Sequence, residues 1–222
     1  MEMAVALIAA VTMTFGYLAA LVQSNVVRLL DFIDQGEKDS PFMGFMFFES
    51  AHARYYFPEE SAIREDYLPE MNYATMDLEA DMPGIFNRYI NASHHLDQQL
   101  GRVLEHLENS GRLDNTIVIV TGDHGEEFME NGRWGHNSEF HNEQIHVPFV
   151  LSLPGSTPSV VERPTSHLDL VPTLLPLLGV TNPATDYSVG RSLLADRSEA
   201  YRLVASWDAL AYVGADYKVA MP

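Results

Sequence analysis

The sequence predicts an α/β fold. Two short apolar runs rich in β-branched and aromatic residues, at 116–120 and 149–153, end in polar loops that contain glycine or proline, as buried strands do. An apolar stripe at helical spacing, from Ile85 to Leu107, precedes the first run. Because 46% of the 222 residues are hydrophobic, the chain can bury one full core. One globular domain with a central sheet is therefore the expected architecture.

The first part of the chain is an apolar segment. Met3 to Val22 carries no charged side chain and is long enough for about one bilayer crossing of roughly 20 residues. Glu2 precedes it, so the basic flank typical of a signal peptide or anchor is missing. Two interpretations stay open, a membrane segment and a piece of a buried core. We treat residues 1–24 as a separate segment, followed by a domain at 25–195 and a small tail at 196–222.

Four elements are expected in the first half of that domain. Apolar residues at helical spacing from Val26 to Ile33, ended by Gly36, predict a short helix. The compact run 42–48, after Pro41, predicts a buried strand. The helix from Ile85 to Leu107 and the strand at 116–120 follow. A strand, a helix and a strand in this order predict parallel pairing through a right-handed crossover.

The second half is expected to continue with a strand at 149–153 and a helix that begins near Ser166. Ser166 is a suitable N-cap, and Pro172 falls early enough to be tolerated in the first turn. The last residues, 201–221, alternate like short strands around turns at Asp208 and at 214–216. They predict a small antiparallel tail.

The most informative residues are Asp123 and His124, directly behind the strand at 116–120. Asp offers a hard anionic oxygen and His a borderline nitrogen, so the pair can serve one zinc or manganese ion. Gly122 and Gly125 let the backbone bend tightly around them. Loops at the carboxyl ends of parallel strands are where open α/β sheets bind ligands. The sequence therefore predicts a metal site at Asp123 and His124.

Further histidines follow the predicted strands. His136, behind Gly135, is expected to converge with His124, and His52, just past the strand at 42–48, is expected to face the same cleft. His141 and His146 are interpreted as surface-loop histidines.

Composition excludes several classes of function. The net charge is −18, with 31 acidic and 13 basic residues, which disfavours nucleic acid and anionic lipid as general partners. Because this negative charge repels anions, an anionic substrate needs a local metal or histidine site in order to bind. The chain has no cysteine, so it forms no disulfide, thiolate metal site or cysteine nucleophile.

Several motifs occur together in one order: Leu113-Asp114-Asn115-Thr116, Gly122-Asp123-His124-Gly125-Glu126, Gly135-His136, Val147-Pro148, Pro154-Gly155, Asp169-Leu170-Val171-Pro172-Thr173 and Gly190-Arg191-Ser192. With them the chain resembles the sulfatase-like branch of the alkaline phosphatase superfamily, over roughly residues 25 to 195. The resemblance implies a three-layer αβα fold with a mainly parallel sheet. It also implies a divalent metal ion (zinc, manganese or calcium) held by Asp123 and His124, with His136 and His52 contacting the transferred group.

The tail residues Val204-Ala205-Ser206-Trp207-Asp208 are most similar to those of membrane-anchored sulfatase-like proteins of Gram-negative bacteria, which are associated with lipopolysaccharide regulation. This resemblance implies an inner membrane protein with a periplasmic domain, or a periplasmic protein. The segments around Asp123 and around Glu143-Gln144-Ile145-His146 also resemble lipid A phosphoethanolamine transferases. The implied substrates are sulfate or phosphate esters of a lipid or a glycan.

The chain departs from the family at its beginning. Family members place acidic ligands and a nucleophile well upstream of Asp-His-Gly, whereas no such segment precedes Phe42. We therefore expect a fold truncated at the N-terminus and an incomplete hydrolase or transferase. A non-catalytic, membrane-associated regulatory domain and a phosphoethanolamine-type lipid transferase are the alternatives.

Overall fold

A computed structural model of the chain describes residues 26–36, 41–196 and 200–221. They divide into two compact units. Unit 1 holds the described residues up to Val118 and Ser152–Gly155, and unit 2 holds Ile119–Leu151 and the described residues from Ser156 on.

The apolar segment 1–24 lies outside the described residues. Within the described part of the chain, no helix combines the length and the apolarity that a membrane crossing requires. The expected boundaries between residues 1–24, 25–195 and 196–222 stay predictions.

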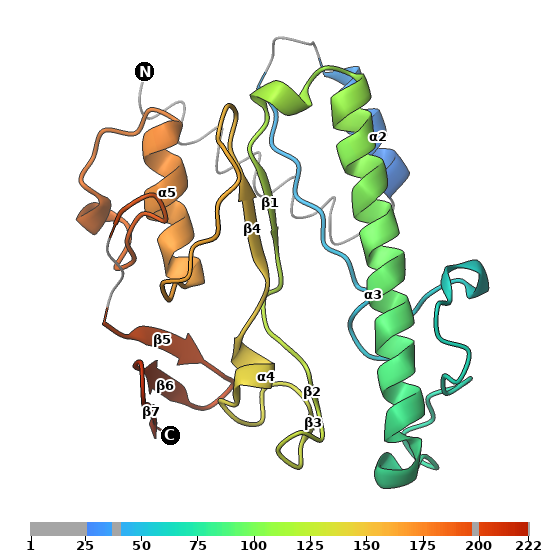
Figure 1. Cartoon of the computed structure of the whole chain (residues 1–222). Coiled ribbons are helices and arrows are strands. Elements are labelled where there is room, and N and C mark those ends of the chain that lie inside the picture. Colours follow the sequence, from blue (N-terminus) through green and yellow to red (C-terminus); the bar gives the residue numbers. More distant parts are fainter. Residues whose placement is uncertain (1–25, 37–40, 197–199, 222) are drawn as a thin grey trace. The chain divides into compact units, whose positions relative to one another are not determined.

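Unit 1 is built on helix α3, Leu78–Asn109, against which helix α2, Val26–Gln35, packs (Figure 1). His106 Nε2 lies 2.8 Å from Asp34 Oδ1, at the end of the helix pair. The short 3-10 helices η1, Glu59–Ser61, and η2, Leu113–Asn115, lie before and after α3. Both predicted helices of this half are thus confirmed.

Helix α3 begins earlier than its apolar stripe predicted. Asp77 caps it, because its Oδ1 accepts hydrogen bonds from the backbone N–H groups of Glu79 and Ala80 at 3.0 and 3.1 Å. Pro83 therefore lies inside the helix, past its first turn, where the Glu79 carbonyl oxygen has no N–H donor four residues later.

The strand expected at 42–48 is not formed. Residues 41–49 have no strand partner among the described residues, and Met43, Phe45 and Phe47 are each about half exposed. A strand needs a neighbour to complete its ladder of hydrogen bonds, and this segment has none. The expected parallel pairing with the strand at 116–120 is consequently absent from the described residues.

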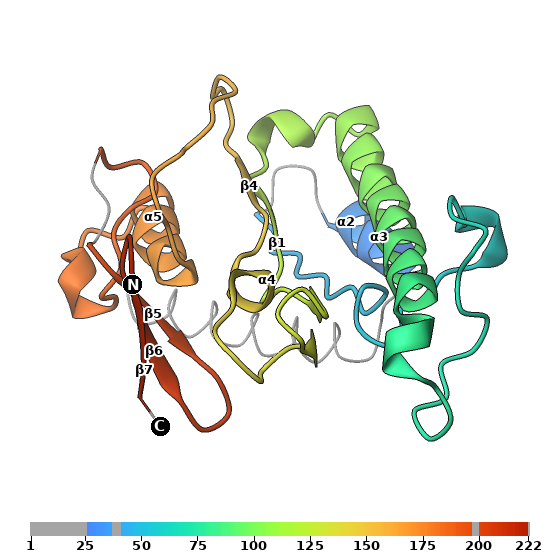
Figure 2. The same ribbon diagram turned by 60° about the horizontal axis from the view of Figure 1, so that its bottom comes forward.

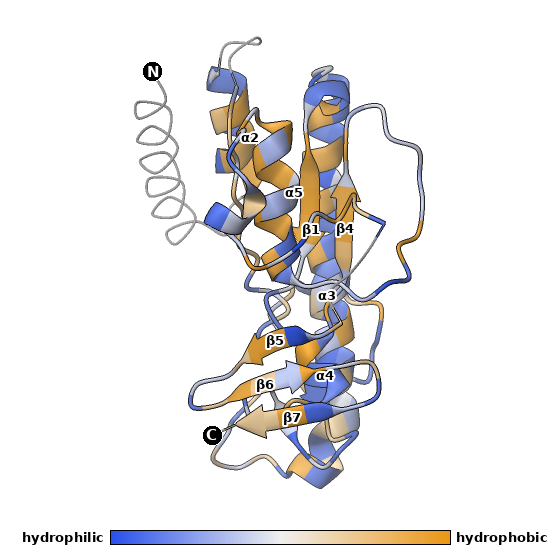
Figure 3. Cartoon of the chain, turned by 90° about the vertical axis from the view of Figure 1, so that its left-hand side faces the viewer, coloured by the Kyte–Doolittle hydropathy of each residue, from blue (hydrophilic) through white to orange (hydrophobic). Residues whose placement is uncertain are grey.

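The described residues form three small sheets, and together with the helices these strands confirm the α/β class. Strands β1, Val118–Thr121, and β4, Phe149–Ser152, pair with each other, and Figure 1 shows the chain running along them in opposite directions. Both strands are strongly apolar in Figure 3. The sequence predicted both of these strands, but the mainly parallel sheet is not seen in the described residues.

Between β1 and β4 lies a short hairpin. Strand β2, Glu127–Phe128, pairs antiparallel with β3, Trp134–Gly135, and the one-turn helix α4, Asn142–Ile145, leads into β4.

After β4 come the 3-10 helix η3, His167–Asp169, helix α5, Leu170–Leu177, and the 3-10 helix η4, Ala184–Asp186. Ser166 is the N-cap residue of η3, as predicted, and its backbone N–H donates to Asp169 Oδ2 at 2.8 Å.

The C-terminal tail is a three-stranded antiparallel meander (Figure 2). It consists of β5, Arg202–Ala205, β6, Leu210–Val213, and β7, Lys218–Met221. Its order and its strands confirm the prediction of a small antiparallel tail.

Candidate metal centre

The loop that follows β1 is folded tightly against the backbone of α4. Gly125 donates its N–H to the carbonyl of Gln144 at 2.8 Å. A Cβ atom on Gly125 would lie only 2.1 Å from the carbonyl oxygen of Glu143, a distance that forbids any side chain there. Gly125 thus allows the chain to bring His124 and Glu126 together on one side of the loop.

Three side chains of this loop form a cluster with metal-ligand chemistry. His124, Glu126 and His136 each offer one ligand atom, and these atoms all lie within 4.8 Å of one another. The imidazole rings of His124 and His136 stack with their centroids 3.8 Å apart and their planes 26° from parallel.

Hydrogen bonds at the Nδ1 atoms orient both rings. His124 Nδ1 lies 2.8 Å from the Gly125 carbonyl oxygen, which can only accept, so Nδ1 carries the proton. His136 Nδ1 lies 2.8 Å from Glu126 Oε2, and the Glu126 side chain is only 7% exposed. In each ring the Nε2 atom is then the one suited to a metal, a common arrangement in metalloproteins.

Asp123, the predicted partner of His124, lies at the edge of this cluster. Its Oδ2 is 3.8 Å from His124 Nε2, and its side chain is 72% exposed. The structure therefore brings His124 and His136 together, as expected, and adds Glu126, which the sequence reading did not single out. Its position two residues beyond His124 was the available signal, because residues i and i+2 of an extended chain lie on one side.

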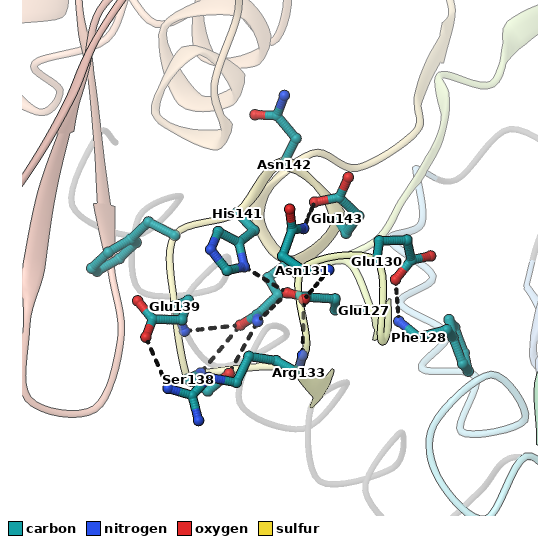
Figure 4. Close-up of polar contacts among 12 residues, drawn as sticks. Glu127, Phe128, Glu130, Asn131, Arg133, Ser138, Glu139, His141, Asn142 and Glu143 are labelled. Atoms are coloured by element: carbon teal, nitrogen blue, oxygen red, sulfur yellow. Dashed lines mark hydrogen bonds and ion pairs between the residues drawn. The ribbon is translucent and has the colours of Figure 1, made fainter. Parts of the chain in front are cut away.

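A second carboxylate stabilises the loop from within. Glu127 is fully buried, and its carboxylate accepts hydrogen bonds from Gln144 Nε2 and His141 Nδ1, each at 2.8 Å, and from the backbone N–H groups of Asn131 and Arg133 at 3.0 and 3.3 Å. Figure 4 shows His141, Asn131 and Arg133 converging on it.

Burial alone raises the pKa of Glu127, but hydrogen bonds from Gln144, His141, Asn131 and Arg133 outweigh it and lower the pKa to about 2. The carboxylate is thus ionised at neutral pH. Its four donors tie the β2–β3 hairpin to α4 and hold the frame that carries the metal cluster.

His52 lies in unit 1, where its Nδ1 is 2.9 Å from the Ala53 carbonyl oxygen. It lines a cavity of its own unit, and its predicted contact with the transferred group stays a prediction. His141 is held by Glu127 and His146 is exposed.

Known proteins share this sequence pattern. The chain is 32% identical over 117 residues to the inner membrane protein YejM of Salmonella typhimurium, covering 52% of this chain and 19% of that protein. It is 33% identical over 87 residues to the choline-sulfatase of Rhizobium meliloti, covering 39% and 17%.

Solved structures share the fold. The phosphonate monoester hydrolase SpPMH of Silicibacter pomeroyi aligns with a TM-score of 0.74 at 18% identity, over 89% of this chain and 51% of that one. An alkaline phosphatase superfamily protein of Vibrio parahaemolyticus aligns with a TM-score of 0.56 at 21% identity, over 87% and 43%.

The aligned part of this chain spans about a fifth of the length of the curated relatives and about half of the solved ones. The sequence model of the family named Sulfatase matches residues 12–180, a range that includes all three residues of the metal-ligand cluster. Because this match covers well over half of the chain, it confirms the resemblance drawn from the motifs: the protein belongs to the sulfatase family.

Proposed function

We propose that this chain carries the cation-binding part of a sulfatase-family hydrolase or transferase that acts on sulfate or phosphate esters. The observation that carries the proposal is the cluster of His124, Glu126 and His136. Two imidazole nitrogens and one carboxylate oxygen are the donor set of many catalytic zinc sites, which keep one position open for water or substrate. Calcium prefers oxygen ligands alone, so zinc or manganese fits the cluster better.

Each residue has a defined part in this proposal. Because their Nδ1 atoms are hydrogen-bonded, His124 and His136 would bind through Nε2. Glu126 would offer a carboxylate oxygen, and Asp123 a further oxygen from the cluster's edge. A divalent ion bound there would stabilise the charge that develops on the ester oxygens. Glu126 also accepts a hydrogen bond from His136 Nδ1. This contact fixes the orientation of the His136 ring towards the reacting group.

The proposal also concerns the sheet to which residues 42–48 belong. We infer that the extended segment 42–48 is a strand of a larger, mainly parallel sheet in a three-layer αβα fold. The half-exposed side chains of Met43, Phe45 and Phe47 support this, because a strand buried on both faces reads as a continuous apolar run.

The metal content of the purified chain tests the proposal. We expect about one zinc or manganese ion per chain after dialysis, measured by elemental analysis, and a loss of at least about tenfold in affinity in His124→Ala, because one ligand is removed. His146→Ala removes an exposed histidine from the same region and should leave the metal content unchanged. A chain that takes up no metal under any loading condition would contradict the proposal.

His136 has two proposed parts that one variant separates. If its Nε2 binds the ion, His136→Gln loses metal together with any ester hydrolysis. If it contacts the transferred group instead, His136→Gln keeps the metal and loses hydrolysis of an aryl sulfate or a phosphodiester. His52→Gln tests the second predicted contact in the same assay, and there metal content should stay unchanged.

A regulatory role is the second candidate, because one relative with 32% identity is named an inner membrane protein. In that role the chain would sit at the inner membrane or in the periplasm and bind its ester ligand without turnover. Stoichiometric metal with no hydrolysis of any aryl ester by the natural full-length protein favours this role, whereas transfer of the group to water or to a lipid hydroxyl favours the enzyme.

A further inference from the structure

Unit 1 contains a cavity of about 520 Å³. Its walls come from the segment 48–56 and from the side of α3 that carries His95, Gln99 and Arg102. This volume lies in the range of small-molecule sites, about 300–1,000 Å³. None of the residues of the proposed metal centre lines it.

The charge of this cavity is opposite to that of the chain. Its lining includes Arg54, Arg102, His52 and His95 but one carboxylate, Glu49. The chain as a whole has 31 acidic and 13 basic residues. A random surface of this protein would therefore carry more carboxylates than guanidinium groups, and the cavity has the reverse.

Neither arginine is paired with a carboxylate in the part of the chain that the structure describes. In residues 26–36, 41–196 and 200–221, no carboxylate oxygen lies within 4.0 Å of either guanidinium. Arg102 Nη1 donates to Gln99 Oε1 at 2.7 Å, and Arg54 Cζ lies 5.7 Å from the centre of the Tyr73 ring. Both neighbours are uncharged, so they orient the guanidinium groups without cancelling their charge.

The segment that carries Arg54 is held in place by the side chain of Arg88 and by a buried tyrosine. Tyr55 is fully buried, and Arg88 donates to the Arg54 carbonyl oxygen from Nε at 3.3 Å and from Nη2 at 3.2 Å. His95 is fixed in turn by Ser61, whose Oγ lies 3.2 Å from His95 Nδ1. A site whose backbone is ordered before binding loses less entropy when the ligand arrives.

We propose that this cavity binds a tetrahedral oxyanion, a phosphate or sulfate group, through the guanidinium groups of Arg54 and Arg102. A guanidinium matches two oxygens of such a group with parallel, charge-assisted hydrogen bonds. The inference goes beyond the proposed function, because it assigns an anion site in unit 1 that needs neither a metal ion nor the cluster in unit 2. The group is either a free anion or the ester group of a larger molecule.

Calorimetric titration of the metal-free chain tests the proposal. Inorganic phosphate, inorganic sulfate and a phenyl phosphate ester are the ligands, and acetate is the comparison. We expect Arg54→Gln and Arg102→Gln each to weaken phosphate binding by about tenfold and the double variant by about a hundredfold, since each removes one charge-assisted pair. Arg64→Gln removes one positive charge from the exposed surface of the same unit and should change binding by less than about twofold.

The outcome is decisive in both directions. Weaker binding in the double variant, with unchanged far-ultraviolet circular dichroism, supports the site, and tighter binding of the phenyl ester than of phosphate identifies the ester as its source. Equal binding by the double variant and the native chain, or equal binding of acetate and phosphate, overturns it. The His124→Ala/His136→Ala variant should bind phosphate normally, so failure of the metal centre would not be mistaken for failure of this site.

Discussion

Glu126 and Glu127 are neighbours in the sequence with opposite surroundings. Consecutive side chains of an extended chain point to opposite faces. Glu126 holds His136 in the metal cluster, whereas Glu127 is fully buried among four hydrogen-bond donors. A buried carboxylate costs several kcal/mol unless its lone pairs are satisfied. The four donors offset that cost and make Glu127 a structural residue. The neighbouring Glu126, in contrast, has the chemistry of a metal ligand.

Substituting Glu127 should change how stability depends on pH. Its pKa is about 2 in the folded chain against an ordinary value of 4.5, so its ionised form stabilises the fold fully above pH 4.5. As the pH falls from 4.5 towards 2, the unfolded chain takes up the proton first, and this stabilisation is lost. Urea unfolding over this range should show a smaller decline in the free energy of unfolding for Glu127→Gln than for the native chain.

At pH 7 the same variant should be less stable by about 1–3 kcal/mol, because its amide NH₂ group faces hydrogen-bond donors. Glu139→Gln, at a partly exposed carboxylate paired with Arg133 at 3.4 Å, is the matched control and should behave like the native chain. Parallel pH curves for the native chain and Glu127→Gln would show that folding does not lower the pKa of Glu127.

Asn91 has a comparable role in unit 1. Its Oδ1 accepts from the backbone N–H groups of Ile63 and Arg64 at 2.9 and 2.8 Å, and its Nδ2 donates to the Arg64 carbonyl at 2.9 Å. Asn91→Ala leaves all three groups without a partner, so we expect a loss of about 2–4 kcal/mol in the free energy of unfolding. Asn87 lies on the same helix as Asn91 and donates one exposed hydrogen bond to the Asp66 carbonyl oxygen. Asn87→Ala should therefore cost about 1 kcal/mol or less. Equal losses would contradict the role of Asn91.

At the scale of elements, the sequence predicted what depends on local spacing. The stripe from Ile85 to Leu107 gave the body of α3, and alternation gave β5, β6 and β7, because both patterns repeat within a few residues. The prediction of a strand at 42–48 was wrong for the described residues, because a strand depends on a partner that no local pattern specifies.

The site was predictable to the same degree. The histidines at 124 and 136 were expected to converge, and they stack. Glu126 could not be separated from its acidic neighbours by sequence, because its distinction is the distance from its carboxylate to His136 Nδ1. That distance depends on how the loop folds back onto α4, a contact between residues far apart along the chain.

The hairpin element depends on Gly125. A side chain there would collide with the Glu143 carbonyl at 2.1 Å and press on the His146 carbonyl at 3.1 Å. Gly125→Ala should therefore push the loop away from α4, lower the free energy of unfolding by about 1–3 kcal/mol, and weaken metal uptake. Gly101→Ala, in α3 with open space around it, should be neutral or slightly stabilising. Normal metal affinity in Gly125→Ala would show that the loop tolerates this displacement.

At the scale of the whole molecule, charge is the dominant property. Cationic groups gather at the cavity of unit 1, and the proposed cation site of unit 2 would hold a further positive charge. Both places offset, locally, a chain whose net charge is −18. An anionic ester approaching this protein meets a repulsive field elsewhere, so these two places are where binding is electrostatically favourable.

The same net charge predicts a response to salt. Repulsion among carboxylates destabilises the compact state, and raising the salt from about 10 mM to about 500 mM shortens the screening length from about 30 Å to about 4 Å. The thermal midpoint of the metal-free chain should therefore rise with sodium chloride at about pH 8. Scanning calorimetry across this range of salt measures this, and a midpoint that falls with salt at pH 8 would show that attractive ion pairs, not net repulsion, dominate the electrostatics of the fold.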